Sequence, residues 1–212
     1  MRRYLAEFIG TFFLVFTVCC ALSVVRSGQV LAPLAIGSVL MVMVYAGGHI
    51  SGGHYNPAVT LAVLVRRRIE MVDAVTYWAV QFVAGAVAAL AAKLVVNPSG
   101  LVALDLSGRA VWAALVAELL FTFALAFVVL NVATSKDHPV NSFYGLAIGF
   151  TVFAGAVAVG PLSGGAFNPA VALGIMTFGL SAWKNIWIYL IAEAAGAALA
   201  ALAFRVMNPG DK

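Results

Sequence analysis

The sequence has little charge for its length. Only 9% of its 212 residues are Asp, Glu, Lys or Arg, whereas 64% are hydrophobic and the mean hydropathy is +1.05. So few charged side chains cannot cover a globular protein of this size, which argues against a soluble enzyme. The net charge of +4 comes from basic residues in short connections between apolar runs. This distribution is typical of a chain in contact with a lipid bilayer, and we expect no nucleic-acid partner.

Residues that commonly perform catalysis or bind metals are also scarce. The two cysteines, Cys19 and Cys20, are adjacent within an apolar run, without metal-like spacing or a distant partner. Together with the three histidines they form no recognisable nucleophile and base set and no set of metal ligands. We therefore expect no enzymatic activity, no metal and no cofactor.

The apolar runs predict helices that cross a membrane. Spans are expected at residues 4–25, 31–49, 74–96, 111–133, 143–160 and 186–207. Two further apolar segments, 56–65 and 168–178, would each reach roughly halfway across a hydrocarbon core of about 30 Å. No charged residue separates either segment from the span before it, so both are expected to be re-entrant. The prediction is an all-α membrane protein with six transmembrane helices and two re-entrant half-helices, forming a single transmembrane domain over residues 1–212.

The basic residues predict the orientation of the chain. Eight would lie on the side of the N-terminus: Arg2, Arg3, Arg66, Arg67, Arg68, Lys136, Arg205 and Lys212. Four would lie on the other side: Arg26, Lys93, Arg109 and Lys184. This bias places both termini in the cytoplasm. The run 66–68 could also contact anionic lipid, but we favour a role in setting orientation. Short termini and compact loops favour a prokaryotic cytoplasmic (inner) membrane as the location.

An internal repeat divides the chain into halves at about 1–105 and 106–212. Residues 51–59 and 163–171, which begin 112 positions apart, are identical at seven of nine positions. Nearly the same offset relates Ala6-Glu7 to Ala117-Glu118. Each half has three predicted spans, an odd number, so the second half must cross the membrane inverted relative to the first. The two half-helices would then enter from opposite faces.

Each copy of the repeat contains a helix-start signal, Asn56-Pro57-Ala58 and Asn168-Pro169-Ala170. Asn caps a first helical turn, and Pro at the first position lacks an amide that would be unpaired there. If the two helix N-termini meet near the midplane, two partial positive charges and two asparagines surround one point. The carbonyls of residues 48–55 and 160–167 would supply acceptors along the path. A small uncharged molecule could bind there, whereas a cation would meet a barrier, so we predict the centre of a pore.

The duplicated motif, with Ala-Glu in the first helix of each half, resembles the aquaporin, or major intrinsic protein, family. The resemblance covers essentially the whole chain. It implies an hourglass fold of six tilted helices and two half-helices in an inverted repeat. It also implies one pore per subunit, a homotetramer in the lipid bilayer, and passive passage of water or small neutral solutes.

The resemblance also identifies a second constriction, the selectivity filter. By distance from the two motifs, its four positions are Ile36, Ala156, Gly165 and Val171. Water-selective members usually have an aromatic residue, a His, a small residue and an Arg there, so this filter should be wider and less polar. The resemblance then suggests water with ammonia, urea, hydrogen peroxide or metalloid hydroxides. Glycerol ranks lower, because glycerol channels usually have Arg-Asp after the second motif. Val171 could alternatively serve helix packing alone.

Several polar residues fall within or beside the predicted spans. The resemblance implies that Glu7 and Glu118 accept hydrogen bonds from the re-entrant loops, although a proton relay is the alternative. Gln81 and Glu193 align in the repeat and are expected to form interhelical hydrogen bonds. The vestibule residues His49 and His54 could titrate as a gate, but a fixed structural hydrogen bond is favoured. We expect Gly85 and Gly196 at close helix crossings.

A rival function remains at this stage, a proton- or ion-coupled secondary transporter, because such transporters also use inverted repeats with broken helices. A third possibility, a purely structural role at a membrane junction, would leave the paired asparagines unexplained.

Overall fold

The computed structural model describes residues 1–24 and 31–211, so Arg26 and Lys212, which enter the predicted charge bias, lie outside the described residues. Within these ranges six helices are long and apolar enough to cross a membrane. They are α1 (Arg2–Val24), α2 (Leu31–Ser51), α4 (Met71–Val95), α5 (Arg109–Thr134), α6 (Tyr144–Ser163) and α8 (Ile186–Met207), the last preceded by the short 3-10 turn η1 (Trp183–Asn185). Two shorter helices follow α2 and α6, namely α3 (Pro57–Val65) and α7 (Pro169–Phe178). The predicted all-helical fold is confirmed.

The helices before the two motifs end later than the sequence predicted. The amide of Gly52 donates to the carbonyl of Gly48, and that of Gly164 donates to Gly160, so helical bonding continues to the serines of the motif. Both Gly52 and Gly164 have positive φ angles, of 90° and 95°, which end the helices. The predicted carbonyl path over 48–55 and 160–167 therefore begins within helices, and the carbonyls of Gly48 and Gly160 already accept helical hydrogen bonds.

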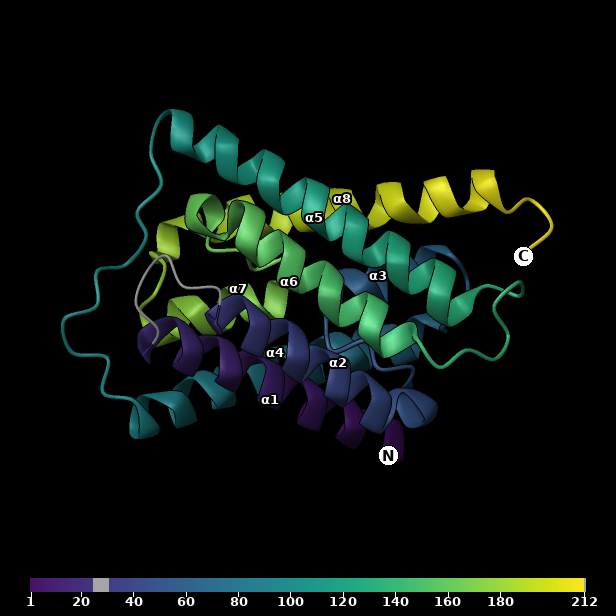
Figure 1. The fold of residues 1–212 in the computed structure, drawn as a ribbon, viewed down its shortest axis with the longest axis horizontal. Coiled ribbons are helices and arrows are strands. Elements are labelled where there is room, and N and C mark those ends of the chain that lie inside the picture. The colour runs from purple at the N-terminus through teal and green to yellow at the C-terminus, as the bar shows by residue number, and fades with distance from the viewer. Residues whose placement is uncertain (25–30, 212) are drawn as a thin grey trace.

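The two halves are interleaved rather than side by side. Within each half the first helix packs against the last, α1 on α4 and α5 on α8, and α2 packs against α6 across the halves. Each half-helix packs more extensively on the last helix of the other half than on the last helix of its own half. Thus α3 packs mainly on α8, and α7 packs mainly on α4. In Figure 1 the long helices run roughly along one axis, and the two chain ends lie toward the same side of the bundle.

Glycines permit the closest of these helix contacts. A Cβ added at Gly85 in α4 would lie 2.7 Å from the carbonyl oxygen of Ala170 in α7. One added at Gly196 in α8 would lie 2.5 Å from the carbonyl oxygen of Leu119 in α5. Both distances are far below van der Waals contact, so the expectation of close crossings at these two glycines is confirmed.

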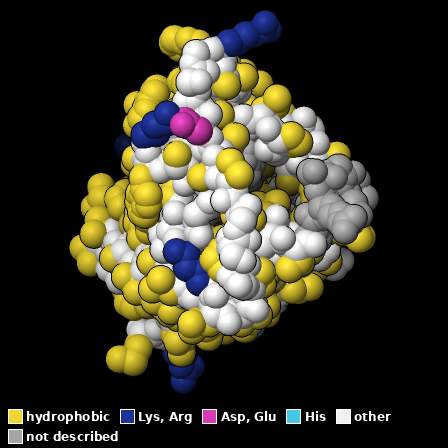
Figure 2. All heavy atoms as spheres, turned by 90° about the vertical axis from the view of Figure 1, so that its left-hand side faces the viewer, with side chains coloured by type: hydrophobic (Ala, Val, Ile, Leu, Met, Phe, Trp, Pro, Cys, Tyr) yellow, Lys and Arg dark blue, Asp and Glu magenta, His cyan; other side chains and the backbone are white. Residues whose placement is uncertain are grey.

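The outer surface of the bundle is apolar. Large hydrophobic side chains from all six long helices are exposed, among them Leu94 on α4, Trp112 on α5 and Leu202 on α8. Figure 2 views the end opposite the termini, where hydrophobic side chains crowd the margin and few charged side chains are visible. Such an apolar girdle is what a helix bundle presents to lipid.

Candidate functional site

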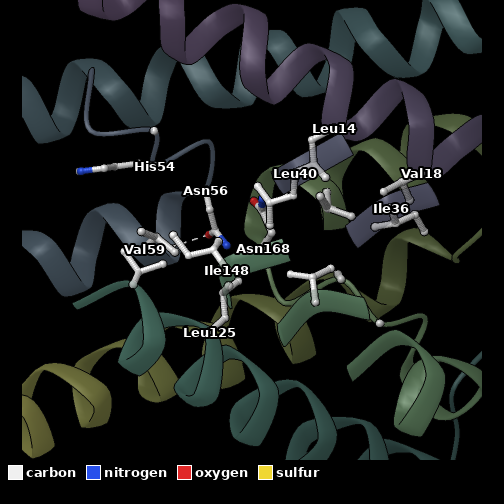
Figure 3. Close-up of a pocket in the computed structure, with 16 residues that line it drawn as sticks. Leu14, Val18, Ile36, Leu40, His54, Asn56, Val59, Leu125, Ile148 and Asn168 are labelled. Atoms are coloured by element: carbon white, nitrogen blue, oxygen red, sulfur yellow. Dashed lines mark hydrogen bonds between the residues drawn. The ribbon is translucent and has the colours of Figure 1, made fainter. Parts of the chain in front are cut away.

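The two half-helices meet end to end inside the bundle, and their first residues bond to each other's loops. The side-chain amide nitrogen of Asn56 donates to the carbonyl of Phe167 at 2.8 Å, and that of Asn168 donates to the carbonyl of Tyr55 at 2.9 Å. Both asparagines are 3% exposed. Figure 3 shows them side by side, with Asn56 carried by the segment before α3 and Asn168 by that before α7. The repeat has thus produced a reciprocal pair of hydrogen bonds between the halves.

The same side chains also cap their own helices. The oxygen of Asn56 accepts from the amides of Ala58 and Val59, and that of Asn168 accepts from the amide of Ala170. In each asparagine the side-chain oxygen and the side-chain nitrogen are therefore both held by hydrogen bonds. The nitrogen carries two N–H groups, and one of them has no partner among these contacts. With the positive ends of two helix dipoles beside them, these donors favour a neutral or electron-rich atom over a cation.

A carboxylate from α1 contacts the first re-entrant loop. One oxygen of Glu7 accepts from the Ser51 hydroxyl at 2.7 Å and from the His54 amide at 3.0 Å. The other accepts from the Tyr55 amide at 2.7 Å and from the Gln81 side chain at 2.9 Å. Glu7 is fully buried. Four donors thus converge on one carboxylate, which leaves it little capacity to take part in proton transfer.

The second half repeats this arrangement with one difference. Glu118 on α5 accepts from the Ser163 hydroxyl at 2.6 Å and from the amides of Ala166 and Phe167 at 3.1 and 2.7 Å. The position equivalent to Gln81 is Glu193, which is fully buried and forms a side-chain hydrogen bond with Glu118. Two carboxyl groups can share such a bond only when one of them carries the proton. The expected interhelical bonds are therefore present at both Gln81 and Glu193.

A narrow cavity passes the two asparagines. Its lining is mostly apolar: Leu14, Val18, Ile36, Leu40, Gly53, His54, Asn56, Val59, Leu125, Val129, Ile148, Val152, Gly165, Ala166, Asn168 and Val171. About 20 Å³ of it can hold the centre of a water molecule. A volume of roughly 10–15 Å³ on this measure suffices for one water, so molecules would pass one at a time.

Three of the four expected filter residues line this cavity, namely Ile36, Gly165 and Val171. Ala156 does not, although its Cα lies 3.7 Å from the position that a Cβ on Gly165 would occupy. Figure 3 places Ile36 at the end of the cavity beyond Asn168, away from His54. Ile36 and His54 thus lie toward opposite ends of the cavity, with the paired asparagines between them.

The two vestibule histidines have different surroundings. His54 is buried, its Nδ1 lies 3.0 Å from the Thr60 hydroxyl, and its ring contacts Tyr77 edge to face. It lines both the narrow cavity and a wider pocket of about 690 Å³ that opens toward the chain termini. His49 is exposed and lines a separate surface pocket that includes His138. Only His54 therefore faces the narrow cavity.

Thr60 is a contact residue that the sequence pattern did not identify. Its hydroxyl donates to the carbonyl of Asn56 and accepts from Gln81, in addition to its contact with His54. In the sequence, Thr60 stands out only as a polar residue on an otherwise apolar half-helix. This does not indicate a contact with other elements, because threonine hydroxyls commonly bond to the backbone of their own helix.

Six apolar spans, two opposed half-helices and a narrow cavity between them define an integral membrane protein built as an inverted repeat. Comparison with known proteins specifies the family. The family model described as "Major intrinsic protein" matches residues 1–204, so the chain belongs to the major intrinsic protein family. It is accordingly a membrane channel of the aquaporin and glycerol-facilitator type.

Individual relatives agree with this assignment. The chain is 44% identical to "Glycerol uptake facilitator protein-like 6" of Lactiplantibacillus plantarum, covering 100% of both chains. It is 37% identical to "Aquaporin NIP1-1" of Oryza sativa subsp. japonica, covering 100% of this chain and 76% of the relative. The X-ray structure of the aquaglyceroporin from Plasmodium falciparum superposes with a TM-score of 0.82 at 20% identity, covering 98% of this chain and 97% of the other. This last likeness supports the fold.

Proposed function

We propose that the chain conducts water and small neutral solutes passively through the cavity beside the paired asparagines. The observation that carries this proposal is the reciprocal hydrogen bonding of Asn56 and Asn168 at the meeting point of the two half-helices. It leaves amide N–H donors beside a path whose other walls are mostly apolar. A solute with a lone pair can bind briefly there and move on, because the mostly apolar walls offer few competing polar contacts.

The size of the cavity ranks the solutes. Room for about one water centre at a time favours water, and ammonia and hydrogen peroxide are of similar size. Urea, metalloid hydroxides and glycerol are larger, so their passage requires the side chains of the lining to move. We retain glycerol as a second candidate, because a relative that is 44% identical is named as a glycerol uptake facilitator.

The filter proposed here is formed by Ile36, Ala156, Gly165 and Val171. It contains no fixed cation and no side-chain hydrogen-bond donor, so the exclusion of cations rests on the two helix N-termini. Removing an arginine from such a constriction removes five donors and one charge. The expected consequence is weaker discrimination between water and other small neutral solutes.

Val171→Arg tests the filter. In proteoliposomes followed by stopped-flow light scattering, we expect this substitution to abolish the passage of urea, ammonia or glycerol while water still passes. Val171→Leu is the matched control, because it adds bulk without charge or donors. If Val171→Arg leaves the passage of these solutes unchanged, the filter assignment is refuted. If both substitutions have the same effect, side-chain bulk alone determines which solutes pass.

The same vesicles separate a channel from a coupled transporter. A channel gives a flux that is linear in the osmotic difference and depends weakly on temperature, whereas a transporter saturates and follows an ion gradient. We further propose a homotetramer in a prokaryotic cytoplasmic membrane with both termini in the cytoplasm. Support for this orientation comes from basic residues that lie together near both termini, namely Arg2, Arg3, the run 66–68, Lys136 and Arg205. Protease accessibility of terminal tags in sealed vesicles tests it.

A further inference from the structure

A second pocket, of about 480 Å³, lies where the C-terminal segment meets the loop after α3. It shares no lining residue with the narrow cavity, and its volume is within the range of small-molecule sites, about 300–1,000 Å³. The lining consists of three arginines, one carboxylate and two uncharged residues: Arg66, Arg67, Arg205, Asn208, Pro209 and Asp211. The pocket is therefore cationic.

One of these arginines is structural. Arg66 is 4% exposed, and its guanidinium donates to the hydroxyl and the carbonyl of Thr134 at 2.7 and 2.9 Å. It also forms an ion pair with Asp211 at 3.0 Å and lies over the ring of Phe204. Asp211 contacts Arg68 as well, at 3.0 Å. The Asp211 carboxylate is thus paired with both Arg66 and Arg68, and these ion pairs hold one side of the pocket in place.

The other two arginines retain free hydrogen-bonding capacity. Arg67 and Arg205 are exposed, and within residues 1–24 and 31–211 neither guanidinium forms a hydrogen bond or an ion pair. Each guanidinium offers donors in a planar fork that matches the oxygens of a phosphate group. Two such forks in one pocket, with the single carboxylate already paired, are arranged to receive an anion.

The place of the pocket indicates where that anion comes from. Arg205 lies in the last turn of α8, three residues after Leu202, which shares its side of the helix and is 52% exposed. Leu202 belongs to the apolar outer surface, so the pocket opens where that surface meets the polar end of the bundle. The phosphate of a phospholipid occupies this level of a bilayer.

We propose that this pocket binds a phosphate group through Arg67 and Arg205, and that the phosphate belongs to an anionic phospholipid. Free inorganic phosphate shares the chemistry, but it would not use the apolar surface beside Arg205. The site is distinct from the solute path and does not depend on which solute the channel conducts.

The test compares lipid and phosphate binding to the purified full chain. Phosphatidylglycerol, phosphatidylcholine and inorganic phosphate are titrated separately, and binding is measured by native mass spectrometry and by protection against thermal unfolding in detergent. The variant is Arg67→Gln/Arg205→Gln. The matched control is Arg2→Gln/Lys136→Gln, which removes two exposed charges from the same end of the bundle but outside the pocket.

We expect phosphatidylglycerol to bind the wild type more tightly than phosphatidylcholine. Each basic residue near an anionic lipid contributes about 1 kcal/mol, roughly fivefold in affinity, so the pocket variant should bind about 30-fold more weakly. The control should stay within a few-fold of the wild type, whereas Arg67→Lys/Arg205→Lys keeps both charges but loses the planar forks and should bind with an affinity between those of the wild type and the pocket variant. Equal losses in the pocket variant and the control would overturn the site. Binding of inorganic phosphate without phosphatidylglycerol would overturn its assignment to lipid.

Discussion

Replacing Glu7 by alanine removes the acceptor of four buried hydrogen bonds. Two of the donors, the amides of His54 and Tyr55, belong to the backbone of the re-entrant loop and cannot turn toward another partner. The Ser51 hydroxyl and the Gln81 side chain can reorient. An unsatisfied buried donor costs about 1–3 kcal/mol, so the two amides alone should lower the free energy of unfolding by about 2–6 kcal/mol.

The measurement is the unfolding of the purified protein in detergent, with water permeability in vesicles recorded in parallel. A loss of this size should lower the melting temperature by on the order of 10 °C. Glu7→Gln keeps one oxygen acceptor but turns a donor toward the remaining donors, so an intermediate loss is expected. Glu118→Ala should behave like Glu7→Ala, because Glu118 also receives two loop amides. If Glu7→Ala unfolds within about 1 kcal/mol of the wild type, the reasoning is refuted.

Two further predictions concern other parts of the bundle. Burial penalises the Asp211 carboxylate, but the Lys136 amide and the Arg66 side chain outweigh this and hold its pKa at about 2. The stability that Asp211 contributes should therefore be complete above about pH 4 and be lost as the pH falls toward 2. Unfolding midpoints between pH 5 and 2 should fall more steeply for the wild type than for Asp211→Asn, and parallel curves would contradict this. Gly85→Ala places a methyl 2.7 Å from the Ala170 carbonyl oxygen, and should cost about 1–3 kcal/mol in detergent unfolding, whereas an unchanged midpoint would show that α4 and α7 separate freely.

The helices could be predicted because their signals are local. Apolar runs of sufficient length, together with Asn-Pro at the start of each half-helix, place six spans and two half-helices within a few residues of the observed bounds. The boundaries that were missed, at Ser51 and Ser163, depend on where a glycine takes a positive φ angle. Hydropathy does not show whether a glycine takes a positive or a negative φ angle, because glycine adopts both readily.

The contacts between distant residues could not be predicted in the same way. The repeat indicated that Asn56 and Asn168 would meet, but not that each would donate to the loop of the other half. Arg66 was interpreted as part of a charge run that sets orientation or contacts anionic lipid, not as the partner of a particular carboxylate. Its ion pair with Asp211 joins residues 145 positions apart, and no periodicity in the sequence encodes that contact.

The exchange of partners between the halves has a consequence for how the protein is made. The half-helix α3 packs against α8, which is synthesised after it as part of the second half, whereas α7 packs against α4 from the first half. When α3 enters the membrane, its main partner has therefore not yet been synthesised. The first half therefore lacks the main packing partner of α3 until α8 has been inserted, so the passage cannot be completed one half at a time.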